Sequence, residues 1–480
     1  MTGILIAGTS SDAGKSLLVT GLCRVAVRRG IDVAPFKAQN MSNNSMVVAD
    51  GEIGRAQWLQ AKAARLTPTT ILNPVLLKPG SDRQSFVVLR GQPAGQLRSG
   101  EYATGRAHLR TSAWQAFEEL RSQHDLVICE GAGSPAEINL REGDYTNMGL
   151  ARQFNLPVVL VGDIDRGGVL ASIFGTHGLL DDEDRSLLRG YIINKFRGDQ
   201  DILGPGLITL TERTGLTNFG VLPWLPGMWI DREDTLQVGQ FGPPEQGDGI
   251  LRVAAIRLPR VSNATDVDAL AHEPGVHVAV TQHPGDIAAA DVVVLPGSRA
   301  TVADLQWLRE QGLAAAVERH ASAGKPVLGI CGGMQMLGHH IQDSLETGDD
   351  AEGLGLLPFE TRFGSEKVLG TPQGVWREIP VAGYEIHHGR PYRIDGDTEE
   401  FPGGLRRGNV WASMWHGTME CDDFRRAWLT EAAAQAGSDW RPAPEAEGFD
   451  TARERMIDAV ADAIEARLDV EALFALALKC

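Results

Sequence analysis

The sequence predicts an α/β fold: a doubly wound parallel sheet of the P-loop type, followed by a second α/β domain. A glycine-rich loop at residues 8–16 stands between a short apolar run and an amphipathic segment. Apolar runs of strand length then alternate with helical stretches. After a Gly- and Pro-rich stretch at residues 241–250 the same alternation starts again. Such alternation is typical of parallel sheets with helices on both faces.

The loop GTSSDAGKS at residues 8–16 has the composition of a phosphate-binding loop. Its glycines let backbone N–H groups approach phosphates, and the following helix N-terminus favours negative charge. The first glycine stands six positions before Gly14 instead of five, so the strict P-loop spacing fails by one residue. Lys15 would reach the β/γ-phosphates and Ser16 would bind Mg²⁺. We expect the nucleotide to contact Thr9, Asp12, Gly14, Lys15 and Ser16.

Polar residues follow the next predicted strands of the first half. Strands at residues 31–34, 125–129 and 191–193 lead to Lys37, Glu130 and Asn194. Doubly wound sheets bind ligands at the carboxyl ends of their strands. An acidic residue at a strand tip beside a phosphate loop usually organises Mg²⁺, so Glu130 is a predicted metal ligand, the alternative being a solvated loop carboxylate. The Asn194-Lys195-x-Arg197 stretch lacks the aspartate of a guanine-reading element, so we expect Asn194 to contact ATP.

The second half contains a nucleophile elbow with cysteine in place of serine. Gly329-x-Cys331-x-Gly333 lies between a predicted strand and a predicted helix. The helix N-terminus lowers the pKa of a thiol there, and the thiolate is the reactive form. The backbone N–H of Gly332 and one from the Gly297-Ser298 loop could form an oxyanion hole. The alternative for Cys331 is an inert buried thiol.

A reactive Cys331 needs a base, and His416 is the candidate that we favour among the twelve histidines. It follows an extended apolar stretch and precedes a predicted helix. His387 and His388 are rivals, and a purely structural role for His416 is equally compatible with the sequence.

Length and composition give the domain organisation. A chain of 480 residues is too long for one core. We predict domains at 1–240 and 251–437, a linker at 241–250 and a helical tail at 438–480. An apolar stripe of Ala459, Ile464, Leu468 and Leu473 predicts that the tail packs within the chain or against a second copy in a homo-oligomer.

The charge, the hydropathy and the cysteine content argue against several classes of protein. A formal net charge of −17 argues against non-specific nucleic-acid binding. The absence of an 18-residue apolar run argues against a membrane span, and we see no signal peptide. Five scattered cysteines without a Cys-x-x-Cys pair argue against a disulfide framework and fit the cytoplasm.

These motifs together closely resemble the cobyric acid synthase family, the glutamine-dependent amidotransferases of cobalamin biosynthesis. The resemblance covers about residues 3–430. The shifted glycine also resembles the deviant loop of the wider group that includes dethiobiotin synthetase. The carrying stretches are residues 8–16, 34–44, 73–79, 130–140, 163–168, 194–199, 383–387 and the Cys331 elbow.

The resemblance implies a dethiobiotin-synthetase-like ATP-binding domain followed by a class I glutamine amidotransferase domain. It implies ATP- and Mg²⁺-dependent amidation of the b, d, e and g carboxylates of a corrinoid, adenosylcobyrinic acid a,c-diamide. The product would be adenosylcobyric acid, and L-glutamine would supply the ammonia.

The resemblance also assigns roles to single residues. Lys37 would steady the transferring phosphoryl group, Glu130 would join Ser16 on the metal, and Asp50 is a weaker metal candidate. Cys331 would attack glutamine with His416 as base. Thr418 stands where class I enzymes carry a glutamate, so the third triad member is left open.

Two rivals stay open at this stage. Cobyrinic acid a,c-diamide synthase uses the same two halves on an earlier substrate. A partition-type P-loop ATPase, a switch without a synthetic product, belongs to another class, but it gives no reason for an elbow cysteine. The order of the amidations, the corrinoid contacts and the ammonia route cannot be predicted from the sequence.

Overall fold

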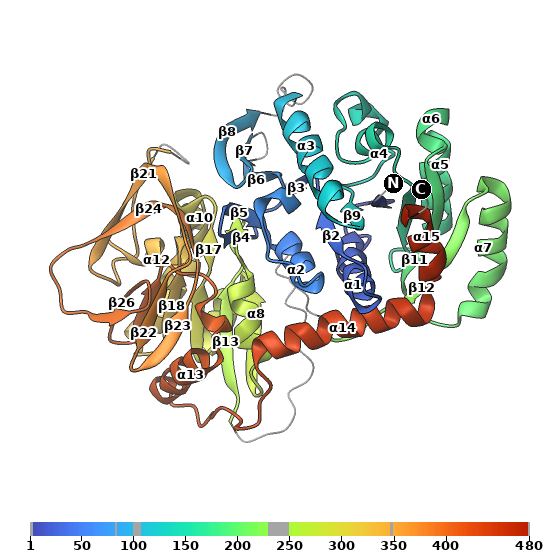
Figure 1. The fold of residues 1–480 in the computed structure, drawn as a ribbon. Coiled ribbons are helices and arrows are strands. Elements are labelled where there is room, and N and C mark those ends of the chain that lie inside the picture. The colour runs from blue at the N-terminus through green and yellow to red at the C-terminus, as the bar shows by residue number, and fades with distance from the viewer. Residues whose placement is uncertain (1–2, 82–83, 99–106, 229–248, 346–348, 479–480) are drawn as a thin grey trace. The chain divides into compact units, whose positions relative to one another are not determined.

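A computed structural model describes residues 3–81, 84–98, 107–228, 249–345 and 349–478 (Figure 1). The chain forms two compact units. The first comprises Met1–Ser42, Val48–Asp231 and Arg453–Cys480, and the second comprises Asn43–Val47 and Arg232–Ala452. Most of the predicted linker at residues 241–250 lies outside the described residues.

The first unit is organised around a six-stranded sheet in which every pairing is parallel. The strand order β12-β11-β10-β1-β9-β2 places β1 (Gly3–Gly8) inside the sheet. All six residues of β1 are buried, as expected for a strand with both faces covered. The other strands are β2 (Val33–Phe36), β9 (Leu126–Glu130), β10 (Val158–Asp163), β11 (Leu188–Phe196) and β12 (Thr217–Pro223).

Parallel pairing brings the polar strand ends to one edge, where Asp163 pairs with Asn194. The predicted strand at residues 31–34 is displaced, because β2 begins at Val33 and includes Pro35. Proline is tolerated there because β2 is an edge strand, which can spare one N–H group. The displacement places Lys37 directly after the last residue of β2.

Helices and a second sheet complete the first unit. The second sheet has the order β3-β6-β7-β8. Its strands are β3 (Gln39–Met41), β6 (Val75–Ser81), β7 (Gln84–Leu89) and β8 (Gln92–Arg98). The helices are α1 (Lys15–Arg28), α2 (Arg55–Ala63), α3 (Ala107–Gln123), α4 (Met148–Phe154), α5 (Val169–Leu179), α6 (Asp182–Arg185) and α7 (Gln200–Thr214). Short elements of the first unit are β5 (Gly51–Gly54) and the 3-10 turns η1 (Thr70–Leu72) and η2 (Ile138–Gly143), whereas β4 (Ser45–Val48) belongs to the second unit up to Val47.

The tail forms two helices, α14 (Phe449–Arg467) and α15 (Val470–Leu478), and from Arg453 onward it belongs to the first unit. Figure 1 shows α14 beside α1, and Arg24 donates to Asp458 at 2.8 Å. The prediction that Ala459 belongs to the apolar stripe is wrong, because this residue is exposed. Helical periodicity puts the neighbouring positions inside instead. The buried stripe is Ile457, Val460, Ala461, Ile464 and Leu468.

The second unit contains a seven-stranded sheet with the order β15-β13-β16-β18-β27-β26-β25. Its first five strands pair in parallel and the last two pairings are antiparallel. The strands are β13 (Leu251–Ile256), β15 (Val276–Thr281), β16 (Val292–Leu295), β18 (Val327–Ile330), β25 (Glu399–Phe401), β26 (Gly404–Arg407) and β27 (Val410–Ser413).

Smaller elements surround this sheet. A four-stranded sheet contains β19 (His340–Gln342), β20 (Asp350–Glu352), β21 (Phe359–Gly370) and β24 (Glu385–Arg393). Two-residue strands β14 (Val261–Ser262) and β17 (Gly297–Ser298) pair antiparallel, as do β22 (Gln373–Trp376) and β23 (Ile379–Ala382). The helices are α8 (Thr265–His272), α9 (Pro284–Ala289), α10 (Thr301–Glu310), α11 (Leu313–Ser322), α12 (Gly332–Leu337) and α13 (Asp422–Ala436), with the turn η3 (Thr418–Glu420). Within the described ranges, no helix has the length and apolar character needed to cross a bilayer.

Candidate active site

The phosphate-type loop joins β1 to α1 in the first unit. Gly14, with φ +93°, precedes the first residue of α1. A Cβ atom at this position would lie 2.1 Å from Nδ2 of Asn194, which donates to the carbonyl of Ala13 at 2.9 Å. Both the backbone conformation and the close approach therefore require glycine. The structure thus brings Asn194, at the end of β11, against the loop.

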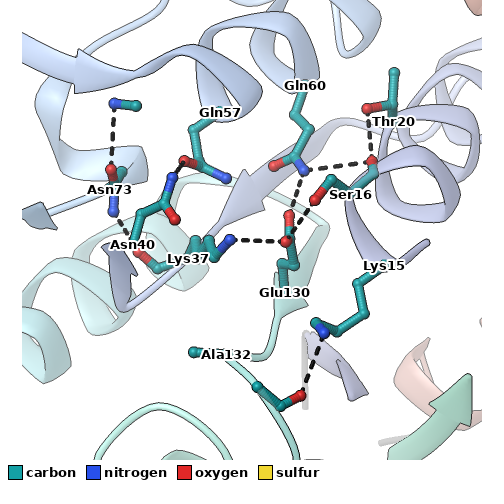
Figure 2. A network of polar contacts seen from close by, with 12 residues as sticks. Lys15, Ser16, Thr20, Lys37, Asn40, Gln57, Gln60, Asn73, Glu130 and Ala132 are labelled. Atoms are coloured by element: carbon teal, nitrogen blue, oxygen red, sulfur yellow. Dashed lines mark hydrogen bonds and ion pairs between the residues drawn. The ribbon is translucent and has the colours of Figure 1, made fainter. Parts of the chain in front are cut away.

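Lys15 and Ser16 are the first two residues of helix α1, and their side chains form hydrogen bonds with different groups. The Lys15 ammonium donates to the carbonyls of Ser10, at 3.0 Å, and Gly133, at 3.2 Å. The Ser16 hydroxyl donates to Glu130 Oε1 at 2.8 Å (Figure 2). The loop, the start of α1 and the end of β9 therefore meet at one point.

Glu130 is the centre of a buried polar network. Its Oε1 accepts from the Lys37 ammonium at 2.8 Å, and its Oε2 accepts from Gln60 Nε2 at 2.6 Å (Figure 2). Burial would raise the pKa of Glu130, but the charge of Lys37 and the hydrogen bonds from Lys37, Gln60 and Ser16 outweigh it and hold the pKa below its ordinary value. The carboxylate is thus kept ionised although only 1% of the residue is exposed.

Asp12 and Thr9, the remaining predicted contacts of the nucleotide, bond groups of β10, β11 and the turn after β10. Asp12 accepts from the exposed Arg166 guanidinium at 3.1 Å, and its carbonyl accepts from Lys195 at 2.6 Å. Lys195 also pairs with Asp163 at 2.7 Å. Thr9 donates its backbone N–H to Val161 at 3.0 Å. Cations from the ends of β10 and β11 therefore surround the loop.

The donor set at Glu130 fits Mg²⁺. This ion is usually held by one or two carboxylates together with phosphate oxygens and waters. Ser16 and Glu130 supply two adjacent hard oxygens at the loop. In the described part of the chain, no group of three or more His, Cys, Asp or Glu side chains could hold a metal without such help.

Asp50 is engaged elsewhere. Its carboxylate accepts from the backbone N–H of Thr70 at 3.1 Å and from the Thr70 hydroxyl at 2.7 Å. It therefore holds the start of the η1 turn. The structure does not bring Asp50 into the Glu130 network.

Cys331 occupies the strand-to-helix turn of the second unit. Its backbone has φ +50° and ψ −108° directly after β18, and its N–H donates to the Ser413 carbonyl at 2.7 Å. A non-glycine residue in this conformation is strained, as expected of a nucleophile elbow. The sulfur lies 4.0 Å from the Ile386 carbonyl, and the residue is 5% exposed.

His416 is held by a carboxylate that the sequence did not single out. Nδ1 of the ring lies 2.6 Å from Asp266 Oδ2, and Asp266 Oδ1 accepts from the Gly417 backbone at 2.6 Å. A carboxylate only accepts, so Nδ1 carries the hydrogen and Nε2 is left for another partner. The Tyr384 ring stacks on the imidazole with centroids 5.3 Å apart.

The charges of Asp266 and Cys331 both shift the pKa of His416. Burial lowers the pKa of His416, but the charge of Asp266 and then that of Cys331 outweigh it and raise the pKa to about 10. Nε2 of His416 has no other hydrogen-bond partner within the described residues.

The loop expected to supply an oxyanion hole lies beside this pair. A Cβ atom on Gly332 would be 2.6 Å from the Ser298 nitrogen, and one on Gly297 would be 2.8 Å from the His416 ring. The two predicted glycines are therefore brought together beside Cys331 and His416.

The rival histidines face other groups. Nδ1 of His387 bonds the Gly389 carbonyl at 2.8 Å, and Nδ1 of His388 bonds the Gly364 carbonyl at 3.2 Å.

Asp266 and Gln60 are the site residues that sequence reasoning missed. Asp266 lies in the first turn of α8, after the first strand of the second half, and that position was a usable signal. Asp268 in the same turn would have been an equal candidate. Gln60 is a carboxamide inside a helix, and nothing in the sequence marks it.

Comparison with known proteins agrees with this geometry. Residues 4–235 match the CobQ/CobB/MinD/ParA nucleotide binding domain, and residues 252–424 match the CobB/CobQ-like glutamine amidotransferase domain. A solved glutamine amidotransferase covers 38% of this chain and 98% of its own, at 18% identity and a TM-score of 0.32. The two domain matches, together with the site, define a nucleotide-binding protein with a glutamine amidotransferase domain.

Relatives that match over nearly the full length identify the family within this class of protein. The chain is 63% identical to a cobyric acid synthase of Cutibacterium acnes, over 98% of this chain and 99% of the relative. It is 55% identical to a cobyric acid synthase of Mycolicibacterium gilvum, over 99% and 97%. The chain therefore belongs to the cobyric acid synthase family, and the match extends into the tail that the motif resemblance left out.

Proposed function

We propose that this protein amidates the b, d, e and g carboxylates of adenosylcobyrinic acid a,c-diamide, using ATP and ammonia from glutamine, to give adenosylcobyric acid. One observation carries the proposal: a single chain holds both a strained cysteine beside a His–Asp pair and a phosphate loop whose serine bonds a buried carboxylate. The family relation over the full length supports the corrinoid substrate.

In the glutaminase half, Cys331 thiolate attacks the side-chain amide of glutamine. The oxyanion forms beside the N–H groups of Gly332 and the Gly297–Ser298 strand. His416 gives its proton to the departing ammonia, which leaves a glutamyl thioester, and water then releases glutamate. Asp266 is a positioning residue that fixes the Nδ1–H tautomer and offsets the imidazolium charge.

In the synthetase half, Lys15 and Lys37 hold the phosphates while the carboxylate of the corrinoid attacks the γ-phosphorus. Ser16 and Glu130 would hold Mg²⁺, which neutralises charge on the phosphates when bound. A carboxylate is a poor electrophile, and the acyl phosphate so formed has a good leaving group. Ammonia attacks the acyl carbon and displaces phosphate. Water would hydrolyse the acyl phosphate, so the site must exclude water.

Incubation with ATP, glutamine and each of two corrinoids tests this proposal. We expect mass changes that correspond to four amide steps on the a,c-diamide and none on cobyrinic acid. Amidation of cobyrinic acid alone would instead identify an a,c-diamide synthase. ATP hydrolysis without amide formation on either corrinoid would favour the partition-type switch.

The Cys331→Ala variant separates the two halves. We expect it to lose glutamine-dependent synthesis and to retain synthesis from free ammonia, because the phosphoryl chemistry needs no thiol. Cys421→Ala, which removes a half-buried thiol of the same unit, is the matched control and should keep both activities. Loss of both activities in Cys331→Ala would refute this division of labour.

A further inference from the structure

Helix α2 carries two buried carboxamides whose free atoms have no assigned role. Gln57 and Gln60 are both 0% exposed. In the described part of the chain, Gln57 Nε2 and Gln60 Oε1 find no hydrogen-bond partner. A buried polar atom without a partner is costly, and in a native site it points to a ligand.

The orientation of Gln60 follows from its neighbour. Gln60 Nε2 donates to Glu130 Oε2 at 2.6 Å, while Ser16 and Lys37 donate to Oε1 of the same carboxylate. The carbonyl oxygen of Gln60 is therefore the free atom, and it can accept a hydrogen bond.

Gln57 has the opposite polarity. Its Oε1 accepts from Asn40 Nδ2 at 2.9 Å, which leaves its Nε2 as a free donor. Residues three apart on a helix share one face. Figure 2 shows the two free atoms pointing toward one another on the side of α2 that faces Lys37 and Glu130.

We propose that Gln57 and Gln60 form the subsite in which the acyl phosphate meets ammonia. The inference rests on the proposed function. Gln57 Nε2 donates to the carbonyl oxygen of the acyl phosphate, and Gln60 Oε1 accepts an N–H of the incoming ammonia. The free donor matches the oxygen that gains negative charge, and the free acceptor matches the nitrogen that gains positive charge.

Atoms and electrons balance in the reaction of ammonia with the acyl phosphate. The nitrogen lone pair of ammonia forms the C–N bond, and the carbonyl electrons move to the oxygen held by Gln57. The C–O bond to phosphate then breaks, and the surplus proton of the nitrogen leaves with the phosphate. Neither glutamine gains or loses a proton, so both bind and orient the reactants.

The neighbouring network explains why carboxamides suit this place. Lys37 and Glu130 form an ion pair with side chains 4% and 0% exposed. A further charge here would upset that pair, whereas a neutral carboxamide offers a donor or an acceptor without net charge. The subsite therefore lies beside the groups that would hold the phosphoryl group.

The test compares Gln57→Met and Gln60→Met with wild type, using ammonium chloride in place of glutamine, the a,c-diamide corrinoid and ATP. Lys62→Met, on the same helix but paired with Glu454 at 3.5 Å, is the matched control. We expect Gln60→Met to raise the KM for ammonia at least about tenfold. We expect Gln57→Met to lower the kcat of amidation about 100-fold, as removal of an oxyanion donor does.

The ratio of ADP formed to amide formed identifies which step of the reaction each variant impairs. It should rise in both variants, because acyl phosphate that is not captured by ammonia hydrolyses, and it should stay at the wild-type value in Lys62→Met. An unchanged ratio with an unchanged ammonia KM would overturn the proposal. So would a change confined to the KM for ATP, which would mean that Gln60 acts only by positioning Glu130.

If Gln57→Met does not fold, a second variant at the same position tests the proposal. Gln57→Glu keeps an oxygen for Asn40 and removes the free N–H, so the ratio should still rise. An unchanged KM for ATP in this variant shows that the added charge leaves the Lys37–Glu130 pair intact. Failure of the proposed function is distinct, because wild type itself would then form no amide from ammonia and ATP.

Discussion

Asp266 Oδ2 lies 2.6 Å from His416 Nδ1, although 150 residues separate the two in the chain. Both side chains are almost fully buried, with 2% and 0% exposed. We propose Asp266, on helix α8, as the third triad member, because Thr418 stands where class I enzymes carry a glutamate.

Asp266→Asn should lower the glutaminase kcat by roughly 10²–10⁴-fold, because the amide no longer fixes the tautomer or offsets the imidazolium charge. Glutamate release measures this effect. Asp268→Asn, in the same turn of α8, is the control and should stay near wild type. Equal activity of Asp266→Asn and wild type would show that the contact is only structural.

The raised pKa of His416 predicts a pH-dependent stability. The folded-state pKa of about 10 lies above the ordinary 6.5, so the stabilisation is complete below pH 6.5 and is lost as the pH rises toward 10. The difference in unfolding free energy between wild type and Asp266→Asn should therefore shrink over this interval. Urea unfolding at several pH values measures it, and a difference independent of pH would contradict the prediction.

Gly14→Ala should abolish ATP binding, because its methyl group would collide with Asn194 and φ is +93°. Gly30→Ala offers a matched comparison: φ is +74°, and nothing lies within 4 Å of the added carbon. Both changes should cost about 1–2 kcal/mol of stability through backbone strain, but only Gly14→Ala should lose nucleotide. Calorimetric titration with ATP decides between them, and comparable affinities would rule out the close approach.

Ile464→Ala should destabilise the first unit by about 2–5 kcal/mol, because it empties a buried site against α1. A Cβ atom on Gly21 would lie 2.4 Å from the Ile464 side chain, so the two helices are in close contact. Ala459→Ser, on the exposed face of α14, should change stability little. Thermal unfolding with and without ATP measures both, and equal melting temperatures would show that the tail does not belong to the core.

The sequence alone predicted the α/β class, a parallel sheet followed by a second α/β domain, and the strand–loop–helix units. These features depend on the periodicity of apolar residues and on the positions of glycines within short stretches of sequence. Local chain geometry is enough to produce them. Cys331, Gly332, Lys15 and Ser16 could be singled out for the same reason. Strand ends were less certain: β2 is displaced because an edge strand accepts Pro35, which local propensity disfavours.

Tertiary structure decided which distant groups meet. It joined Asp266 to His416, Gln60 to Glu130, and α14 to α1, and it placed Asp50 against Thr70 instead of the Glu130 network. No local signal marks such partners, because a carboxylate or carboxamide in a helix has the same propensity whatever it faces. Packing over tens to hundreds of residues selects the partner, whereas the sequence determines the loops and strands that each site begins from.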